Sequence, residues 1–264
     1  MGRVDVELVA RGLAPSRSAA QRLIADGAVR DGHGAPVLRA SQQVSGFDEL
    51  RVEPSDETRY ASRAGAKLAH ALAASGVDPR GAVALDLGMS TGGFADCLLQ
   101  AGAARIVGIE VGHGQLHPRL RADPRVACLE HLNVREVTPQ VLAARLSEPP
   151  PADGFDLLVA DLSFVSLTKV LAAVDPLLAP GAIALLLVKP QFELSPGELD
   201  GRGVVVSPAD RARAVESVTT ACLALGWTVH GVHDSALAGG DGNRETFLHA
   251  SRPGARALPS RTER

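Results

Sequence analysis

The sequence has few cysteines, no long apolar segment and no excess of basic residues. Its three cysteines, at positions 97, 128 and 222, lie far apart and form no Cys-x-x-Cys pair. They therefore predict neither a disulfide framework nor a zinc centre, and they favour a reducing, cytoplasmic compartment. The longest aliphatic run, residues 182–188, is far shorter than the roughly 20 residues that cross a membrane as a helix. The first residues also lack the apolar core of a secretion signal, so we expect no membrane association.

The overall charge balance weighs against a role bound to RNA. The chain has 27 basic and 30 acidic residues, a net charge of −3 and an isoelectric point near 6.2. A neutral total can still conceal a local basic face. With 264 residues, of which 45% are hydrophobic, the chain is long enough for one sizeable core and a small additional module.

The most informative segment is residues 86–94, Asp-Leu-Gly-Met-Ser-Thr-Gly-Gly-Phe. The apolar run ahead of it is typical of a buried strand, and residues 94–100 after it are typical of an amphipathic helix. Its glycines allow the backbone to pass close to a ligand, and the start of the helix offers unpaired N–H groups. The pattern indicates a nucleotide-like ligand, and the alternative is an ordinary tight turn between a strand and a helix.

The kind of nucleotide follows from spacing. The glycines match neither the Gly-x-Gly-x-x-Gly fingerprint of dinucleotide sites nor the phosphate-binding P-loop. A second apolar run, residues 106–109, ends in Glu110, where a carboxylate can accept two hydrogen bonds from a ribose diol. A turn without phosphate-binding spacing, together with a carboxylate for a ribose, fits S-adenosylmethionine.

The first 53 residues form a separate module. Residues 4–11 and 16–26 predict two short amphipathic helices, and Pro15 and Ser16 mark the start of the second. Three short β segments are expected, at residues 28–30, 36–38 and 49–52. Residues 54–60 are polar and predict a linker.

From residue 62 onward the pattern is that of an α/β protein. A helix is expected from 62 to about 75. After it, apolar strands alternate with helical stretches, and the strands are expected at 83–87, 105–110, 126–130, 156–161, 182–188, 228–233 and finally 246–250. Such alternation predicts a doubly wound, mostly parallel sheet with helices on both faces. We expect a first domain with its linker at 1–58, a second at 59–251, and a disordered tail at 252–264.

Three charged residues stand at strand ends. Asp161 and Lys189 each follow an apolar run, and Glu245 precedes the last one. Because ligands of open α/β sheets bind beyond the carboxyl ends of the strands, Asp161 and Lys189 should reach the crevice that the glycine turn lines. A lysine that closes a buried strand is costly unless it is paired or used, and it could serve as a base on a hydroxyl. A purely structural Lys–Asp ion pair is the alternative.

Several short motifs occur together between residues 3 and 250. They are Arg3-Val-Asp5, Arg11-Gly-Leu13, Ser16-Arg17, Tyr60-Ala-Ser-Arg63 before Lys67-Leu68, Ser90-Thr-Gly-Gly-Phe94, Gly114-Gln-Leu116, Asp123-Pro-Arg-Val126, Asp161-Leu-Ser-Phe164, Val188-Lys-Pro-Gln-Phe192, and Gly242-Asn243 before Glu245. In these motifs the chain resembles the TlyA family, whose members join an S-four-like RNA-binding domain to a methyltransferase domain of the FtsJ type.

The resemblance implies a fold and an activity. The fold is a Rossmann-like class I methyltransferase preceded by a small α+β S-four-like RNA-binding domain. The activity is 2′-O-methylation of a ribose in ribosomal RNA, with S-adenosylmethionine as methyl donor, ribosomal RNA or ribosomal subunits as partner, and no metal. The family's Lys-Asp-Lys-Glu tetrad falls on Lys67, Asp161, Lys189 and Glu245. In that scheme Lys189 deprotonates or polarises the 2′-hydroxyl, the two carboxylates align it, and Lys67 helps to position the hydroxyl.

Further site residues follow from the motifs and the resemblance. The residues expected at the methyl donor are Asp86, Gly88, Ser90, Thr91, Gly92, Phe94, Glu110, Val111, Asn133 and Asp161. The residues expected to contact RNA are Arg3, Arg11, Arg17, Arg22, Arg30 and Arg63. Two histidine pairs, 113 with 117 and 230 with 233, lack an evident third ligand, so no metal site is predicted.

The chain also departs from the family pattern. Met89 stands where a small residue is usual, and His113 occupies a position that is commonly Tyr. The loop 193–203 and the segment 205–207 differ from the familiar versions. These changes surround the acceptor side, so they bear on which nucleotide is modified. Two other functions stay open: an O-methyltransferase diverted to a small molecule, and a non-catalytic RNA-binding or ribosome-assembly factor, against which the complete tetrad argues.

Overall fold

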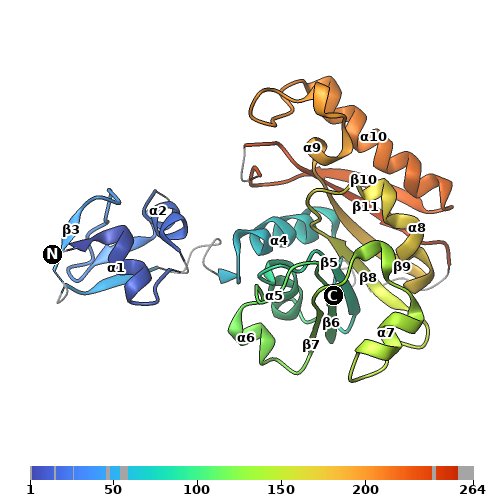
Figure 1. Ribbon diagram of the computed structural model, residues 1–264, viewed down its shortest axis with the longest axis horizontal. Coiled ribbons are helices and arrows are strands. Elements are labelled where there is room, and N and C mark those ends of the chain that lie inside the picture. The colour runs from blue at the N-terminus through green and yellow to red at the C-terminus, as the bar shows by residue number, and fades with distance from the viewer. Residues whose placement is uncertain are drawn as a thin grey trace. The chain divides into compact units, whose positions relative to one another are not determined.

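The computed structural model describes residues 2–14, 16–25, 27–45, 48–53, 59–239 and 242–254. The chain forms two compact units, Met1–Arg59 and Tyr60–Arg264 (Figure 1). Several expected features lie outside the described residues: Pro15, Asp26, residues 54–58 of the linker and residues 255–264 of the tail. The side chain of Arg22 is also outside them.

The N-terminal unit is a small α+β module. Its elements are β1 (Gly2–Arg3), α1 (Val4–Ala10), α2 (Arg17–Ala25), β2 (Val29–Asp31), β3 (Gln43–Val44) and β4 (Leu50–Val52). Strand β1 pairs with β3 and β2 pairs with β4, both antiparallel. The two predicted helices and two of the predicted β segments are therefore confirmed. The third, residues 36–38, contributes only an isolated bridge from Pro36 to Arg30.

The core of this unit is aliphatic and surrounds one buried carboxylate. Val4, Leu8 and Ile24 pack together inside it. Asp5 is fully buried, and its oxygens accept hydrogen bonds from Arg3 at 2.9 and 3.1 Å, from Arg17 at 3.1 Å and from Gln21 at 2.9 Å. The hydrogen bond from Arg3, supported by those from Gln21 and Arg17, holds the pKa of Asp5 well below its usual range against the opposing effect of burial.

The C-terminal unit contains a seven-stranded sheet with the order β10-β11-β9-β8-β5-β6-β7. The strands are β5 (Val83–Leu87), β6 (Arg105–Ile109), β7 (Val126–Leu129), β8 (Phe155–Ala160), β9 (Leu178–Val188), β10 (Thr228–Asp234) and β11 (Thr246–Ser251). Strands β5 to β9 pair in parallel, whereas β11 pairs antiparallel with both β9 and β10. The predicted doubly wound, mostly parallel fold is confirmed.

Helices cover both faces of this sheet (Figure 1). They are α4 (Arg63–Ser75), α5 (Gly93–Gln100), α6 (Pro118–Arg121), α7 (Pro139–Arg145), α8 (Leu171–Val174), α9 (Pro190–Glu193) and α10 (Pro208–Ala224). Short 3₁₀ turns are η1 (Val134–Glu136), η2 (Leu167–Lys169), η3 (Asp175–Leu177) and η4 (Pro196–Glu198). Many connections are therefore single turns, in keeping with the many prolines.

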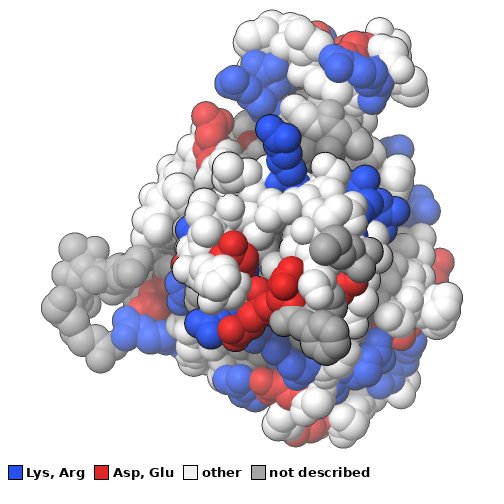
Figure 2. All heavy atoms as spheres, turned by 90° about the vertical axis from the view of Figure 1, so that its left-hand side faces the viewer, with Lys and Arg blue, Asp and Glu red and all other residues white. Residues whose placement is uncertain are grey.

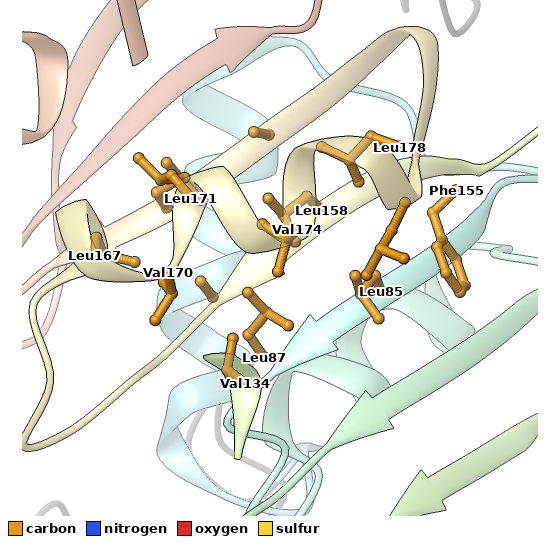
Figure 3. Packing of buried hydrophobic residues seen from close by; sticks show 14 of the residues in the cluster. Leu85, Leu87, Val134, Phe155, Leu158, Leu167, Val170, Leu171, Val174 and Leu178 are labelled. Carbon is orange, nitrogen blue, oxygen red and sulfur yellow. The ribbon is translucent and has the colours of Figure 1, made fainter. Parts of the chain in front are cut away.

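The alternation of side chains along the strands divides the core in two. Leu85 and Leu87 of β5 belong to one apolar cluster, with α7, α8 and α10, whereas Ala84 belongs to the other, with α4 and α5. This is the period of two expected for a strand that is buried on both faces. Figure 3 shows the first cluster, where Leu85 and Leu87 lie beneath Val170 and Val174.

The Asp5 network predicts an acid-sensitive N-terminal unit. Because the folded state lowers the pKa of Asp5, its stabilising effect should be complete above the unfolded pKa of about 4 and be lost as the pH falls below it. Asp5→Asn should therefore destabilise the unit by about 1–3 kcal/mol at pH 7, and by less at pH 3. Since Tyr60 and Trp227 both belong to the other unit, hydrogen exchange of α1 and α2 peptides is the suitable measurement. An equal effect at both pH values would contradict this role.

Candidate active site

The parallel strands place four charged side chains at one edge of the sheet. Asp86 lies on β5, and Glu110, Asp161 and Lys189 directly follow β6, β8 and β9. The register aligns these ends, because Leu87 of β5 pairs with both Ile109 of β6 and Ala160 of β8. The chemistry-bearing residues therefore gather where open α/β sheets bind their ligands.

Lys189 and Asp161 form an ion pair with 2.7 Å between Nζ and Oδ1. Both side chains are largely buried, with 11% and 19% of their surface exposed. The ammonium also donates a hydrogen bond to Ser163 Oγ at 3.0 Å, and it lies 5.9 Å from the ring centroid of Phe192. The lysine therefore has one charged partner, one hydroxyl acceptor and one aromatic face.

Lys67 and Glu245 form a second, more deeply buried pair. Lys67 comes from α4 and Glu245 directly precedes β11, and Nζ and Oε2 are 2.5 Å apart. Both residues are 5% exposed. Thr246 of β11 pairs with Val188 of β9, so Glu245 and Lys189 flank the same register position of two neighbouring antiparallel strands. Two lysine–carboxylate pairs thus meet at the end of β9.

The glycine turn after β5 is shaped by contacts within the protein. Gly88 has a φ of +81° and Gly92 a φ of +89°, a region that L-residues with side chains rarely adopt. A Cβ on Gly88 would lie 2.7 Å from the backbone oxygen of Asp161. A Cβ on Gly92 would collide with the side chains of Leu116 and Leu120. Both glycines are therefore required by packing, in addition to any approach of a ligand.

Glu110 organises the turn that it faces. It is 9% exposed, and its two oxygens accept hydrogen bonds from the backbone N–H groups of Ser90 at 2.9 Å and Gly112 at 2.7 Å. Ser90 itself has a φ of +47°, which is strained for a residue with a side chain. Glu110 thus ties the turn after β5 to the turn after β6, and each oxygen retains a lone pair for a ribose hydroxyl.

Asp86 is a fully buried carboxylate. Among the described residues neither of its oxygens has a hydrogen-bond partner of ordinary geometry, although the nearby backbone N–H of Ala95 favours the ionised form. Burial, together with the negative charges of Asp161 and Glu110, raises the pKa of Asp86 to about 8. An unsatisfied buried carboxylate is costly, and a positively charged ligand would relieve that cost. S-adenosylmethionine carries such charges and a ribose diol, so the residues present fit it.

The other residues predicted to bind the methyl donor differ in how far their side chains are exposed. Thr91 and Asn133 are half-buried, and Val111 is 70% exposed. Asn133 accepts the backbone N–H of Arg135 at 3.0 Å and so caps η1. Phe94 is buried, with its ring centroid 5.9 Å from that of Phe247. Its side chain therefore belongs to the core.

Met89 has a packing role. It is 3% exposed, and a Cβ on Gly108 of β6 would collide with its thioether. The methionine therefore fills space that the glycine on the neighbouring strand leaves open. The missing side chain at Gly108 leaves room for the Met89 side chain, which explains why a large residue is tolerated in the glycine turn after β5.

Most of the arginines predicted to contact RNA are engaged in ion pairs within the N-terminal unit. Arg3 and Arg17 both bind Asp5, Arg11 binds Glu7, and Arg30 binds Glu53. Arg3 and Arg17 are nevertheless 43% and 58% exposed. Arg63, at the start of α4, is half-buried in the C-terminal unit. Figure 2 shows basic and acidic side chains interspersed over the face in view.

The structure draws attention to residues for which the sequence predicted no individual role. Phe164 is 92% exposed and has a φ of +63°, and its ring lies 5.2 Å from that of Phe192. Asn243 and Asp96 are buried polar residues with several hydrogen bonds each. The motif Asp161-Leu-Ser-Phe164 was the available signal for Phe164, but exposure of an aromatic side chain cannot be inferred from a motif.

Neither a metal-binding cluster nor a membrane-spanning helix occurs among the described residues. No cluster of three or more His, Cys, Asp or Glu side chains among them could hold a metal ion. Within the same part of the chain, no helix has the length and apolar character to cross a membrane.

Comparison with known proteins gives consistent matches to both units. The profile of FtsJ-like methyltransferases matches residues 60–252, and that of the S4 domain matches residues 2–50. The "16S/23S rRNA (cytidine-2'-O)-methyltransferase TlyA" of Mycobacterium tuberculosis is 43% identical over 259 residues, which are 98% of this chain and 93% of that protein.

Solved structures agree with these matches. A hemolysin-type protein from Streptococcus thermophilus superposes with a TM-score of 0.73 and 32% identity, over 98% of this chain and 91% of the other. An S-adenosylmethionine-dependent methyltransferase from Listeria monocytogenes shares the fold, with a TM-score of 0.53 and 14% identity over 72% of this chain and 98% of the other. The chain therefore belongs to the TlyA family of S-adenosylmethionine-dependent methyltransferases, in which an S4 domain precedes an FtsJ-like methyltransferase domain.

Proposed function

We propose that this enzyme transfers a methyl group from S-adenosylmethionine to the 2′-hydroxyl of a cytidine in ribosomal RNA. The Mycobacterium tuberculosis relative carries this activity in its name. The observation that carries the proposal is the pair of buried lysine–carboxylate contacts, Lys189 with Asp161 and Lys67 with Glu245. A ribose hydroxyl needs a base or a polarising cation before it attacks, and this edge of the sheet offers both.

The scarcity of lysine supports a chemical role for both cations. The chain has 24 arginines and only three lysines, at positions 67, 169 and 189. Arginine therefore serves at almost every basic position, yet both buried pairs use lysine. A lysine side chain can act as a base once it has given up its proton, whereas a guanidinium stays protonated. A structural ion pair alone would not require this choice.

The proposed roles follow from position. Lys189 accepts the proton of the 2′-hydroxyl or polarises its oxygen, and Asp161 orients the lysine. Lys67 of α4 and Glu245, which precedes β11, position the hydroxyl. The bound donor supplies an electrophilic methyl group on a positively charged sulfur. Because the protein holds both reactants in place, much of the acceleration comes from proximity.

The donor side is formed by the turns after β5 and β6. We propose that Glu110 accepts the ribose hydroxyls of the donor, and that Asp86 faces its positive charge. The backbone from Gly88 to Gly92 borders this space, and Asn133 and Val111 lie near the adenine. The hydrogen bonds that Glu110 accepts from the backbone N–H groups of Ser90 and Gly112 support this assignment, because they hold both turns in one arrangement.

The acceptor side favours RNA over a small molecule. Phe164 exposes nearly its whole ring in a strained backbone conformation, beside the Phe192 ring that faces Lys189. Strain of this kind is retained mainly at functional sites. An exposed ring stacks well on an unpaired base, so we assign Phe164 to the target base. The S4 domain then captures the surrounding RNA, with residues 1–58 as the capture domain and 59–251 as the catalytic domain.

Donor binding should release a proton. At pH 7 most of the free enzyme holds Asp86 protonated, because its pKa is raised to about 8. A positively charged donor favours the carboxylate, so binding should release about one proton at pH 7 and strengthen as the pH rises toward 8. Calorimetry in buffers with different ionisation enthalpies measures this release. Asp86→Asn should abolish it, and adenosine, which lacks the positive charges, should not cause it. Donor binding without proton release in the wild type would contradict the assignment.

Loss of Lys189 should abolish chemistry and spare binding. Lys189→Ala should reduce methyl transfer to ribosomal RNA by about 100-fold or more, while affinity for donor and RNA is retained. Lys189→Arg should not restore the rate, because a guanidinium stays protonated. Lys169→Ala is the matched control, since it removes the remaining, exposed lysine of the chain. The assay follows labelled methyl into RNA and locates it by resistance to alkaline cleavage. A methyl group on a base, or normal transfer by Lys189→Ala, would refute the mechanism.

Removal of Arg17 should weaken RNA binding in a salt-dependent way. If Arg17 neutralises one phosphate, Arg17→Ala should lower affinity and reduce the slope of log K against log salt by about 1. Arg51→Ala is the control, because Arg51 lies in the same unit, is 69% exposed and is likewise paired with a carboxylate, that of Glu49. Filter binding across a series of salt concentrations distinguishes the two variants. Equal slopes for both variants would remove Arg17 from the RNA contact.

A further inference from the structure

Glu245 needs a support that the tetrad itself does not provide. Its partner Lys67 holds one carboxylate oxygen, Oε2, at 2.5 Å. Glu245 lies in the chain segment before β11, where its backbone oxygen accepts the N–H of Ser235 at 2.9 Å. The other side-chain oxygen faces the turn that begins at Gly239. The residues that shape this turn therefore decide where the carboxylate lies.

Asn243 is the central residue of this segment. It is fully buried, and its amide is satisfied at both ends. Its Oδ1 accepts the N–H of Val205 at 2.9 Å, and its Nδ2 donates to the carbonyl of Gly203 at 3.0 Å. Its own carbonyl accepts the N–H of Gly239 at 2.8 Å. One residue thus joins the chain before Glu245 to a distant loop and to the turn at Gly239.

The loop that Asn243 binds is closed on itself. Asp200 Oδ1 accepts the N–H groups of Arg202 and Val204, each at 2.8 Å. At the far end of the loop, Arg211 donates to the carbonyls of Val205 at 3.2 Å and Val206 at 2.7 Å. The conformation of the loop 200–206 is therefore fixed by its own hydrogen bonds, and Asn243 binds the loop through two further hydrogen bonds.

Gly239 lies directly beside the Oε1 oxygen of Glu245. A Cβ built on Gly239 would be 2.6 Å from Oε1, closer than real Cβ atoms approach oxygen. Gly239 is absent from the glycines with positive φ, so a side chain there meets no conformational strain. The close approach to Glu245 is what calls for glycine at this position.

We propose that Asn243 is a positioning residue for methyl transfer, which acts by holding Gly239 against Glu245 and thereby holding Glu245 against Lys67. The loop 200–206 is the anchor, and the amide of Asn243 is the link. This inference rests on the proposed function of the tetrad. It assigns Asn243 no contact with donor, acceptor or reacting atoms.

The first test uses two variants of Asn243. Asn243→Ala removes both bonds to the loop, and Asn243→Asp keeps the acceptor but places an oxygen against the Gly203 carbonyl. Each should lower kcat for methyl transfer to ribosomal RNA by about 10- to 100-fold, the scale of a small displacement of a reacting group. Donor affinity should not change, since the donor turn is untouched. Each rate is divided by the concentration of folded enzyme, which is measured as the number of methyl-donor binding sites in a titration.

The second test separates positioning from stability. Gly239→Ala adds one methyl group that would collide with the end of the Glu245 side chain and would lie at an ordinary contact distance of 3.4 Å from the Asn243 carbonyl oxygen. The melting temperature should therefore hold while kcat falls by a similar factor. Asp175→Asn is the matched control. Asp175 accepts Trp227 Nε1 at 2.7 Å and Arg252 Nε at 3.0 Å, and it precedes the first residue of β9, at the opposite end of the strand from Lys189. That variant should lower the melting temperature and leave kcat unchanged.

The outcomes distinguish this inference from the proposed function. If wild-type enzyme transfers no methyl to ribosomal RNA, the proposed function fails. If wild type is active but Asn243→Ala and Gly239→Ala keep normal kcat per folded enzyme, the positioning role fails and the tetrad stands. If Asn243→Ala merely melts earlier, as Asp175→Asn should, Asn243 is a structural residue and the inference is overturned.

Discussion

The burial of charge at the carboxyl ends of the parallel strands is the constraint on which the rest of the site depends. Parallel pairing brings Asp86, Glu110 and Asp161 to one edge, where three carboxylates would repel one another. Lys189 compensates Asp161 at 2.7 Å, and backbone N–H groups compensate Glu110. Among the described residues Asp86 has no charged partner, and a positively charged ligand would restore the balance of charge at this edge.

The same constraint explains the pairing of cations. A buried ion pair gains little stability, because removing both charges from water costs about as much as their attraction returns. Two such pairs side by side therefore add little to the free energy of unfolding, and their presence is better explained by a functional role. Both pairs use lysine in a chain that has 24 arginines and three lysines. This choice agrees with that view, since lysine, unlike arginine, can exchange its proton during a reaction.

In the N-terminal unit the buried carboxylate of Asp5 holds two arginine side chains in place. Asp5 binds Arg3 and Arg17 while roughly half of each guanidinium side chain stays exposed. Arginines that are held in place lose less conformational entropy when they bind a phosphate, so affinity can arise without a basic excess. The acidic residues of this unit thus do not argue against RNA binding, because a net charge does not register arginines that are held in place and exposed.

The sequence by itself determined the alternation of strands and helices, the two-unit organisation and the identity of the charged residues at strand ends. These are local properties, carried by the apolar period, the glycine turn and the motifs around Asp161, Lys189 and Glu245. Only the tertiary structure decided which charges meet, because Lys67 and Glu245 are 178 positions apart. It also decided that Phe94 faces the core, that Phe164 faces solvent and that Asn243 anchors a distant loop. Such outcomes depend on packing between segments far apart in the chain, and no local pattern encodes them.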